Sequence, residues 1–186
     1  MKKVFVAFAA MIVLAACTRN QQNAAQPAEE CSEVKTEAVV SAADTLSAEA
    51  LKANMEEAQA WLKDCGAFAI ATVDGDQPRV RIFGVSEIID GKLYIMTGKV
   101  KDVYKQIAKN GKFEICALKK SGAEWMRLSG TLVNDETLSV KEEFLNRNAG
   151  LKAMYKADDD NMAVLQITNA TARFCSFGAP ERKVGF

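Results

Sequence analysis

The sequence predicts an α+β domain in which about six strands, mostly antiparallel, close into a barrel with three helices beside or between them. Short runs rich in β-branched and aromatic residues alternate with turn signals. Hairpins make neighbouring strands antiparallel, and closing a small sheet removes its exposed edges. Two longer segments have apolar residues at helical spacing. The turn signals are Asp74-Gly75, Asp90-Gly91, Asn110-Gly111, Ser121-Gly122 and Asn169-Ala170.

Residues 1–16 are a predicted secretory signal. Lys2 and Lys3 precede the apolar run Val4 to Leu14, which is too short to span a membrane as a mature helix. The ending Leu14-Ala15-Ala16-Cys17 resembles a bacterial lipobox, which implies cleavage before Cys17 and acylation of that residue. We expect an exported lipoprotein on the periplasmic side of a membrane, with the outer membrane favoured. A plain secretory signal followed by a chance cysteine is the alternative.

Two further regions follow the signal. Residues 17–44 begin with the lipidated cysteine, are polar and have no sustained apolar period, which predicts a flexible tether. The tether would hold the domain to the membrane through lipid alone. Residues 45–186 are long enough for one domain with a real core.

Helices are predicted at three places. In residues 45–64 an apolar stripe has 4-3-4 spacing, Ser47 or Thr45 can cap the start, and Gly66 can end the helix. Trp61 is expected to pack against the sheet. A helix begins near Asp102, and another covers residues 136–148, with Leu138, Phe144 and Leu145 on its buried side.

The remaining elements are strands. Gly130, in the middle of one of them, indicates a bend or bulge. The final nine residues, 178–186, are basic and are expected at the surface. The predicted strands cover 67–73, a segment from Pro78 to the Asp90-Gly91 turn, 93–97, 113–118, 124–134, 162–168 and 171–177.

The stretch from Pro78 to Gln106 carries the strongest signal for a binding site. Arg79 and Arg81 are two residues apart in a predicted strand, so both project to one face. The loop around Lys99 and Lys101 opens a helix, whose free amides attract anions. These four cations could converge on one phosphate. Ordinary solvated surface charge is the other interpretation.

Composition excludes several classes of function. The formal net charge is zero, which argues against general nucleic-acid binding. There is no histidine, so a Ser-His-Asp triad, a Cys-His pair, and histidine-ligated zinc or haem are excluded. No catalytic residue is evident, and no metal site is predicted, since the spacing of Asp158 to Asp160 is not that of a calcium loop.

Four cysteines remain beyond the lipobox. Cys116 and Cys175 fall in predicted strands and are expected to be buried apolar side chains. Cys31 and Cys65 lie in more exposed segments and could form a disulfide, although nothing in their spacing fixes that pairing.

Three runs, FAIATVDGDQPRVRIFG, DGKLYIMTGKVKDVYKQIAKNGKFEICAL and EWMRLSGTLV, resemble the pyridoxamine 5′-phosphate oxidase-like group of FMN-binding split barrels. The resemblance extends from about Ala67 to the end of the chain. It implies an α+β fold with a six-stranded, mostly antiparallel split β-barrel and flanking helices. It also implies a homodimer with one FMN in each of two grooves at the dimer interface.

The same resemblance implies the binding residues. Arg79, Arg81, Thr97, Lys99 and Lys101 match family positions that hold the phosphate and the ribityl chain, with the choice between the two lysines left open. Two further residues match positions beside the flavin ring or in the groove wall. These are Trp125 and Arg127.

For the last two residues other interpretations stay open. Arg127 could be a surface arginine paired with Glu124 or with an acid on a neighbouring strand. Trp125 could be packed at a dimer interface.

The chain departs from the true oxidase, because it lacks the arginine and histidine pattern that grips pyridoxal phosphate and carries a signal peptide. We expect an FMN-dependent oxidoreductase acting on an unidentified small molecule. The alternative is a split-barrel protein that binds or sequesters flavin or haem without turnover. Haem iron would then need a Met, Cys or Tyr side chain as its axial ligand, so haem is less favoured than flavin. A third possibility is a structural dimer that has lost its cofactor.

Overall fold

The computed structural model describes residues 46–186. The predicted signal peptide, Cys17, the tether and Cys31 lie outside the described residues. Within residues 46–186, no helix is both long enough and apolar enough to cross a membrane.

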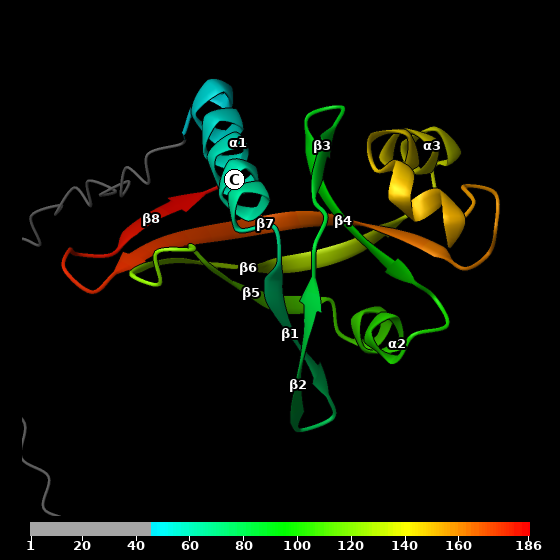
Figure 1. Cartoon of the computed structure of the whole chain (residues 1–186), viewed down its shortest axis with the longest axis horizontal. Coiled ribbons are helices and arrows are strands. Elements are labelled where there is room, and N and C mark those ends of the chain that lie inside the picture. The colour runs from blue at the N-terminus through cyan, green and yellow to red at the C-terminus, as the bar shows by residue number, and fades with distance from the viewer. Residues whose placement is uncertain (1–45) are drawn as a thin grey trace, which may run out of the picture. The chain divides into compact units, whose positions relative to one another are not determined.

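One antiparallel sheet organises the domain (Figure 1). Its strands follow the order β2-β1-β5-β6-β7-β4-β3. Strand β8 pairs with residues 171–174 of β7, beyond the residues that pair with β4. The mostly antiparallel α+β architecture is as predicted, although β8 was not foreseen and the single strand expected from Pro78 to the Asp90-Gly91 turn is divided into β2 and β3. The strands are β1 (Phe68–Asp74), β2 (Gln77–Phe83), β3 (Glu87–Ile89), β4 (Lys92–Gly98), β5 (Lys112–Leu118), β6 (Glu124–Asp135), β7 (Met162–Ser176) and β8 (Arg182–Gly185).

Three α-helices and one 3-10 turn accompany the sheet. They are α1 (Ala48–Cys65), α2 (Asp102–Lys109), α3 (Leu138–Arg147) and η1 (Ala149–Ala153). The predicted caps of α1 are confirmed: the Ser47 hydroxyl accepts a hydrogen bond from the Ala50 amide, and Gly66 ends the helix at φ 71°. Trp61 packs against Phe174 of the sheet and donates its indole N–H to the Ala117 carbonyl, as a core residue would.

Apolar side chains form two clusters. The larger one lies between the sheet and helices α1 and α2, and includes Leu62, Ile70 and Ile107. The smaller one lies under α3 and is centred on Phe144 and Tyr94. The predicted role of Leu138 was wrong, since it is half exposed at the first residue of α3, two residues before the first buried residue, Val140.

The long strands β6 and β7 carry the bulge that the sequence predicted. The register shifts between Ser129 and Thr131, and a Cβ on Gly130 would come within 2.7 Å of the Thr168 carbonyl oxygen. The opposing residue, Asn169, has φ 50°. The turn predicted at Asn169-Ala170 was therefore wrong: β7 is continuous, and the left-handed residue only bends it.

The hairpin predicted around Asp90-Gly91 is present, with both residues at positive φ, but its first arm is short. The segment from Pro78 to the turn divides into β2 and β3. Only β3 pairs with β4, whereas β2 pairs with β1. The expected single strand from Pro78 to the turn would have placed Arg81 beside the strand that leads into the loop of Lys99 and Lys101, and this expectation was wrong.

The C-terminal segment lies at the surface as predicted, with residues 178–183 exposed. It also forms β8, which pairs with β7 and was not predicted, and Phe186 packs partly against the larger core. Cys116 lies in β5 as predicted, but it is exposed, because its side chain points to the face of the sheet opposite Ile115. Cys175 is half-buried.

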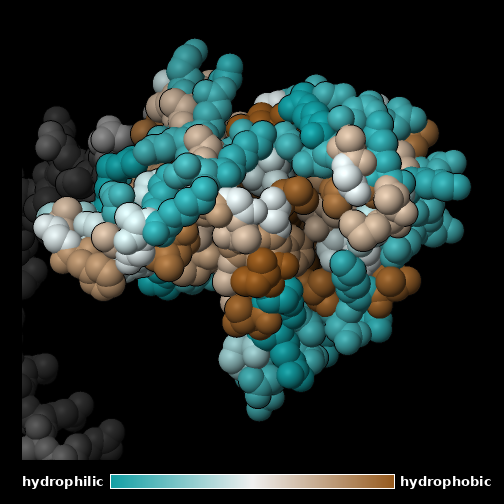
Figure 2. Space-filling model, viewed as in Figure 1, coloured by the Kyte–Doolittle hydropathy of each residue, from teal (hydrophilic) through white to brown (hydrophobic). Residues whose placement is uncertain are grey.

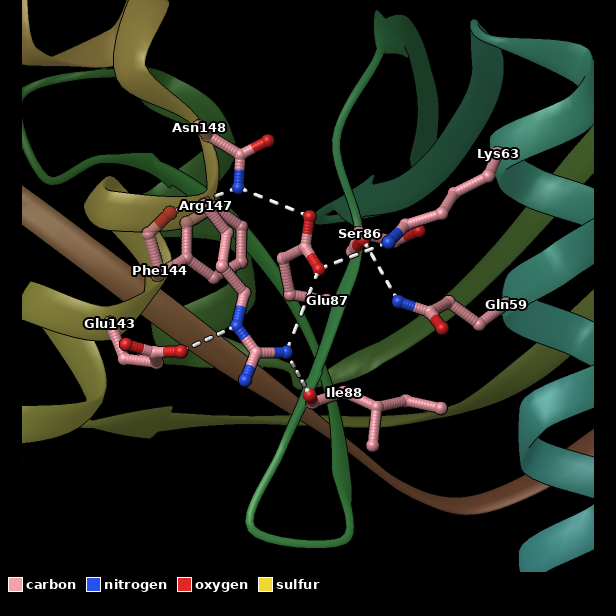
Figure 3. A network of polar contacts seen from close by, with 9 residues as sticks. All are labelled: Gln59, Lys63, Ser86, Glu87, Ile88, Glu143, Phe144, Arg147 and Asn148. Carbon is pink, nitrogen blue, oxygen red and sulfur yellow. Dashed lines mark hydrogen bonds and ion pairs between the residues drawn. The ribbon is translucent and has the colours of Figure 1, made fainter.

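A buried carboxylate joins α1 to α3 through β3 (Figure 3). Glu87 accepts hydrogen bonds from Lys63 of α1 at 3.1 Å and from Asn148, next to α3, at 3.2 Å. Arg147 lies 4.0 Å from the same carboxylate and donates to the Ile88 carbonyl at 2.7 Å. The short strand β3 is thereby held between two helices.

We expect Glu87→Gln to lower the free energy of unfolding by about 2 kcal/mol, because charge-assisted hydrogen bonds of a buried group are lost. Urea unfolding of the domain measures this. The matched control is Glu56→Gln, which removes a carboxylate whose pair with Lys52 is exposed on both sides and should cost about 0.5 kcal/mol or less. Equal losses in the two variants would contradict the role given to Glu87.

Candidate functional site

Strand β2 has two chemically different faces. Arg79 lies opposite Thr72 of β1, and Arg81 lies opposite Ile70. Because Thr72 and Ile70 are buried, both arginines project to the side of the sheet that α2 covers. The prediction that the two arginines share one face is confirmed. The alternate residues, Val80 and Ile82, face the other way.

The arginines line a groove of about 530 Å³ between the β1–β2 hairpin and α2. This volume is in the range of small-molecule sites. The helix contributes residues spaced i, i+3, i+4 and i+7, which is one helical face. The lining residues include Val73, Asp74, Arg79, Arg81, Asp102, Lys105, Gln106 and Lys109.

The guanidinium of Arg81 is fixed by neutral groups. One nitrogen, Nη1, donates to the Thr72 hydroxyl at 2.6 Å, and Nη2 donates to the Gln106 side-chain carbonyl at 2.6 Å. Within residues 46–186, no carboxylate forms an ion pair with Arg81. Burial, and then the nearby charge of Arg79, lower the pKa of Arg81 from its ordinary value. The positive charge is therefore oriented but not neutralised.

The other charges of the groove are only partly compensated. Arg79 pairs with Asp74 at 3.2 Å, and Lys105 pairs with Asp102 at 2.9 Å. No ion pair is found for Lys109 in the described part of the chain. Two positive charges, those of Arg81 and Lys109, thus remain in excess, and the arrangement favours a doubly charged anion.

The predicted lysine loop lies outside this groove lining. Thr97 is buried in β4, and Lys101 has its ammonium 6.0 Å from the Tyr155 ring centre. Lys99 pairs with Glu136 at 2.6 Å, and Glu136 also accepts from Lys141 at 2.5 Å. Hydrogen bonds from Lys141 and then Lys99 lower the pKa of Glu136 to about 2. Lys99, Lys141 and Glu136 therefore form an ion-pair cluster separate from the groove.

The two predicted ring-side residues lie on the opposite face of the sheet. Cross-strand pairing places Ile82, Ala69, Cys116 and Arg127 in one row, on the face away from the core. Arg127 binds Glu114 of the neighbouring strand at 2.5 Å, which is the ion pair foreseen in the alternative interpretation.

Trp125 lies on the same outer face of the sheet as Arg127. It stacks at 5.1 Å against Phe177, which is highly exposed. The structure does not bring Trp125 or Arg127 to the groove of Arg81 within one chain.

Sequence reasoning missed the groove residues on α2, and it missed Thr72, which is not part of the groove lining but accepts a hydrogen bond from Arg81. Lys105, Gln106 and Lys109 share a helical face with Asp102, a pattern visible in the sequence. Thr72 is a polar residue at an inward position of β1, where Phe68 and Ile70 are apolar. Among residues 46–186, no cluster of three or more cysteines and acids could hold a metal ion.

The family model described as pyridoxamine 5′-phosphate oxidase matches residues 55–176. The chain belongs to the pyridoxamine 5′-phosphate oxidase family. The match includes β1 to β7 and the groove between β2 and α2, and it agrees with the split-barrel fold expected from the sequence.

Several solved structures are similar to this chain. A NimC/NimA family protein from Clostridium acetobutylicum is 40% identical, with a TM-score of 0.71, covering 74% of this chain and 96% of that one. General Stress Protein 26 from Bacillus anthracis is 17% identical, with a TM-score of 0.56, covering 70% and 98%. A heme binding protein from Mycobacterium smegmatis is 13% identical, with a TM-score of 0.54, covering 75% and 59%. The last two show the fold alone. No match was found among curated proteins.

The low pKa of Glu136 predicts an acid-sensitive contribution to stability. Since its pKa falls from 4.5 to about 2 on folding, the contribution is complete above about pH 4.5 and is lost as the pH falls toward 2. We expect the difference in unfolding free energy between the wild type and Glu136→Gln to shrink over this interval. Urea unfolding at several pH values measures it, and the exposed Glu142→Gln subtracts the general effect of losing one negative charge. A difference that grows toward low pH would contradict the assignment.

Proposed function

We propose that this protein is an FMN-dependent oxidoreductase of the pyridoxamine 5′-phosphate oxidase family that acts on a small molecule. The observation that carries the proposal is the Arg81 guanidinium, which Thr72 and Gln106 fix and which forms no ion pair with any carboxylate of residues 46–186. An arginine in a groove that is held in one orientation and keeps its positive charge is suited to binding a phosphate group.

The donor set of the groove fits the phosphate of FMN. Arg81 offers a planar fork of donors, and Lys109 adds a second uncompensated charge. Arg79 and Lys105 can exchange their exposed carboxylate partners for a phosphate at little cost, because exposed ion pairs are weak. The residues present therefore fit the group that the family implies.

Bound flavin would supply the redox chemistry, and the protein would supply position and electrostatics. The chain has no histidine and offers no evident acid–base pair, which suits chemistry that the cofactor performs. In this proposal Arg81 holds the phosphate end. The other predicted cofactor residues, Thr97, Lys99, Lys101, Trp125 and Arg127, remain part of the proposal at the ribityl chain and the ring.

Vitamin B6 phosphate oxidation is not proposed as the activity. The arginine and histidine pattern that grips pyridoxal phosphate is absent, since the chain has no histidine. The NimC/NimA family relative at 40% identity is more informative than the family description alone. The substrate class proposed is therefore a small molecule other than pyridoxamine phosphate.

A homodimer is the second part of the proposal. Val80 and Ile82 on the outer face of β2 are 68% and 67% exposed, and Leu118 on the same face is half exposed. Figure 2 shows apolar side chains gathered at the surface over the β1–β2 region. Exposed apolar patches of this kind are typical of protein interfaces. A partner on this face would also cover Trp125 and Arg127.

The remaining proposals concern location and turnover. The lipobox supports export and attachment through acylated Cys17, on the periplasmic side of a membrane. A binding protein without turnover is the alternative, with flavin favoured over haem, because the groove lining contains no Met, Cys or Tyr to ligate iron. Oxidation of a reduced nicotinamide cofactor with an added electron acceptor distinguishes an oxidoreductase from a binding protein.

We expect Arg81→Glu to weaken FMN binding about 100-fold or more, because it removes two charge-assisted donors and adds repulsion. Quenching of flavin fluorescence during titration measures the affinity. The matched control is Arg182→Glu, which removes an exposed arginine that pairs with Glu57 away from the groove. Unchanged FMN affinity in Arg81→Glu would contradict the proposed phosphate site.

We expect the double substitution Val80→Asp and Ile82→Asp to convert the dimer to monomer, because two charges would be buried in an apolar interface. Sedimentation equilibrium measures the mass of the particle. Met154→Asp, at a residue exposed elsewhere on the domain, is the control. A wild-type protein that is monomeric, or a double variant that stays dimeric, would contradict this interface.

A further inference from the structure

A closed triangle of hydrogen bonds supports the groove from beneath. Thr72 is 1% exposed and Gln106 is 8% exposed, so both side chains lie in the wall rather than at the mouth. The Thr72 hydroxyl donates to Gln106 Oε1 at 2.7 Å. Arg81 donates to both acceptors at 2.6 Å. Three elements, β1, β2 and α2, are joined at this point.

The triangle satisfies each acceptor and fixes the direction of each proton. A threonine hydroxyl has one proton and two lone pairs, so Thr72 can donate to Gln106 while accepting from Arg81. The Gln106 carbonyl has two lone pairs, which Thr72 and Arg81 occupy. The guanidinium therefore has one orientation. Nη1 also donates to the Arg79 carbonyl at 3.1 Å, so Nε and one proton of Nη2 are the donors left for a ligand.

The neutrality of both partners is the informative feature. The two other cations on the rim with side-chain partners, Arg79 and Lys105, each have a carboxylate, Asp74 or Asp102. Arg81 alone among these three is held by an amide and a hydroxyl. A glutamate at position 106 could accept the same two hydrogen bonds, but it would cancel the charge that a phosphate requires.

We propose that Thr72 and Gln106 are positioning residues for Arg81, and that the neutral amide of Gln106 sets the preference for phosphorylated over unphosphorylated flavin. This inference rests on the proposed function, and it adds the residues that determine its specificity. Thr72 and Gln106 act through Arg81 and make no contact with the ligand. The affinity for a flavin that has no phosphate should not depend on either residue.

The experiment compares FMN with riboflavin, which carries the same ring and no phosphate. Fluorescence titrations use the chain with residues 1–17 removed. We expect Gln106→Glu to weaken FMN about 100-fold and Thr72→Val about tenfold, since each disturbs a charge-assisted bond network. Riboflavin affinity should change less than about threefold in both variants. Thr72→Ser keeps the hydroxyl and should restore FMN affinity.

Each outcome separates this inference from the proposed function. If the wild type binds FMN more tightly than riboflavin, and Gln106→Glu and Thr72→Val keep that ratio, the positioning role is overturned while the FMN site stands. Equal losses for both flavins would assign Thr72 and Gln106 a structural role and also overturn it. A wild type that binds neither flavin overturns the proposed function itself. Thermal unfolding of each variant confirms that the comparison is between folded proteins.

Discussion

The pairing of β6 with β7 is the constraint on which the rest of the structure depends. These two strands are the longest in the sheet, and every other strand pairs with one of them directly or through intervening strands. Strand β5 pairs with β6 and is followed by β1 and β2, whereas β4 pairs with β7 and is followed by β3. The bulge at Gly130 bends the pair where the backbones approach too closely for any side chain. The position of the groove relative to α2 follows from this frame.

Within that frame, alternation along β2 separates two tasks. Residues 79 and 81 face α2 and line the groove, whereas residues 80 and 82 leave apolar surface exposed on the other side. A period of two residues thus places an anion site and a candidate dimer surface on one edge strand. The charges of Arg81 and Lys109 then give the groove its chemical character.

Local patterns in the sequence predicted much of this fold. Helix α1, its caps, the Asp90-Gly91 turn and the bulge at Gly130 each depend on residues close together in the chain. The continuity of β7 was missed, because Asn169 in a left-handed conformation reads as a turn unless its partner strand is known. The division between β2 and β3 was missed because it, too, depends on which strand each segment pairs with.

The candidate site was only half predictable. That Arg79 and Arg81 share a face follows from strand geometry, and the contribution of Gln106 could have been read from the helical face of α2. The pairing of Lys99 with Glu136 could not be predicted, because helix α2 and strands β5 and β6 separate the two residues in the chain. Thr72 required knowledge of which strand lies beside β2. Non-local pairing therefore decides which cations are free to bind a ligand.

The most direct measurement is a visible absorption spectrum of purified residues 45–186 before and after incubation with FMN. The proposed function predicts a bound-flavin spectrum at one FMN per chain. A colourless protein that ignores added FMN while its fold remains intact would contradict it, and the cations between β2 and α2 would then be ordinary surface charge.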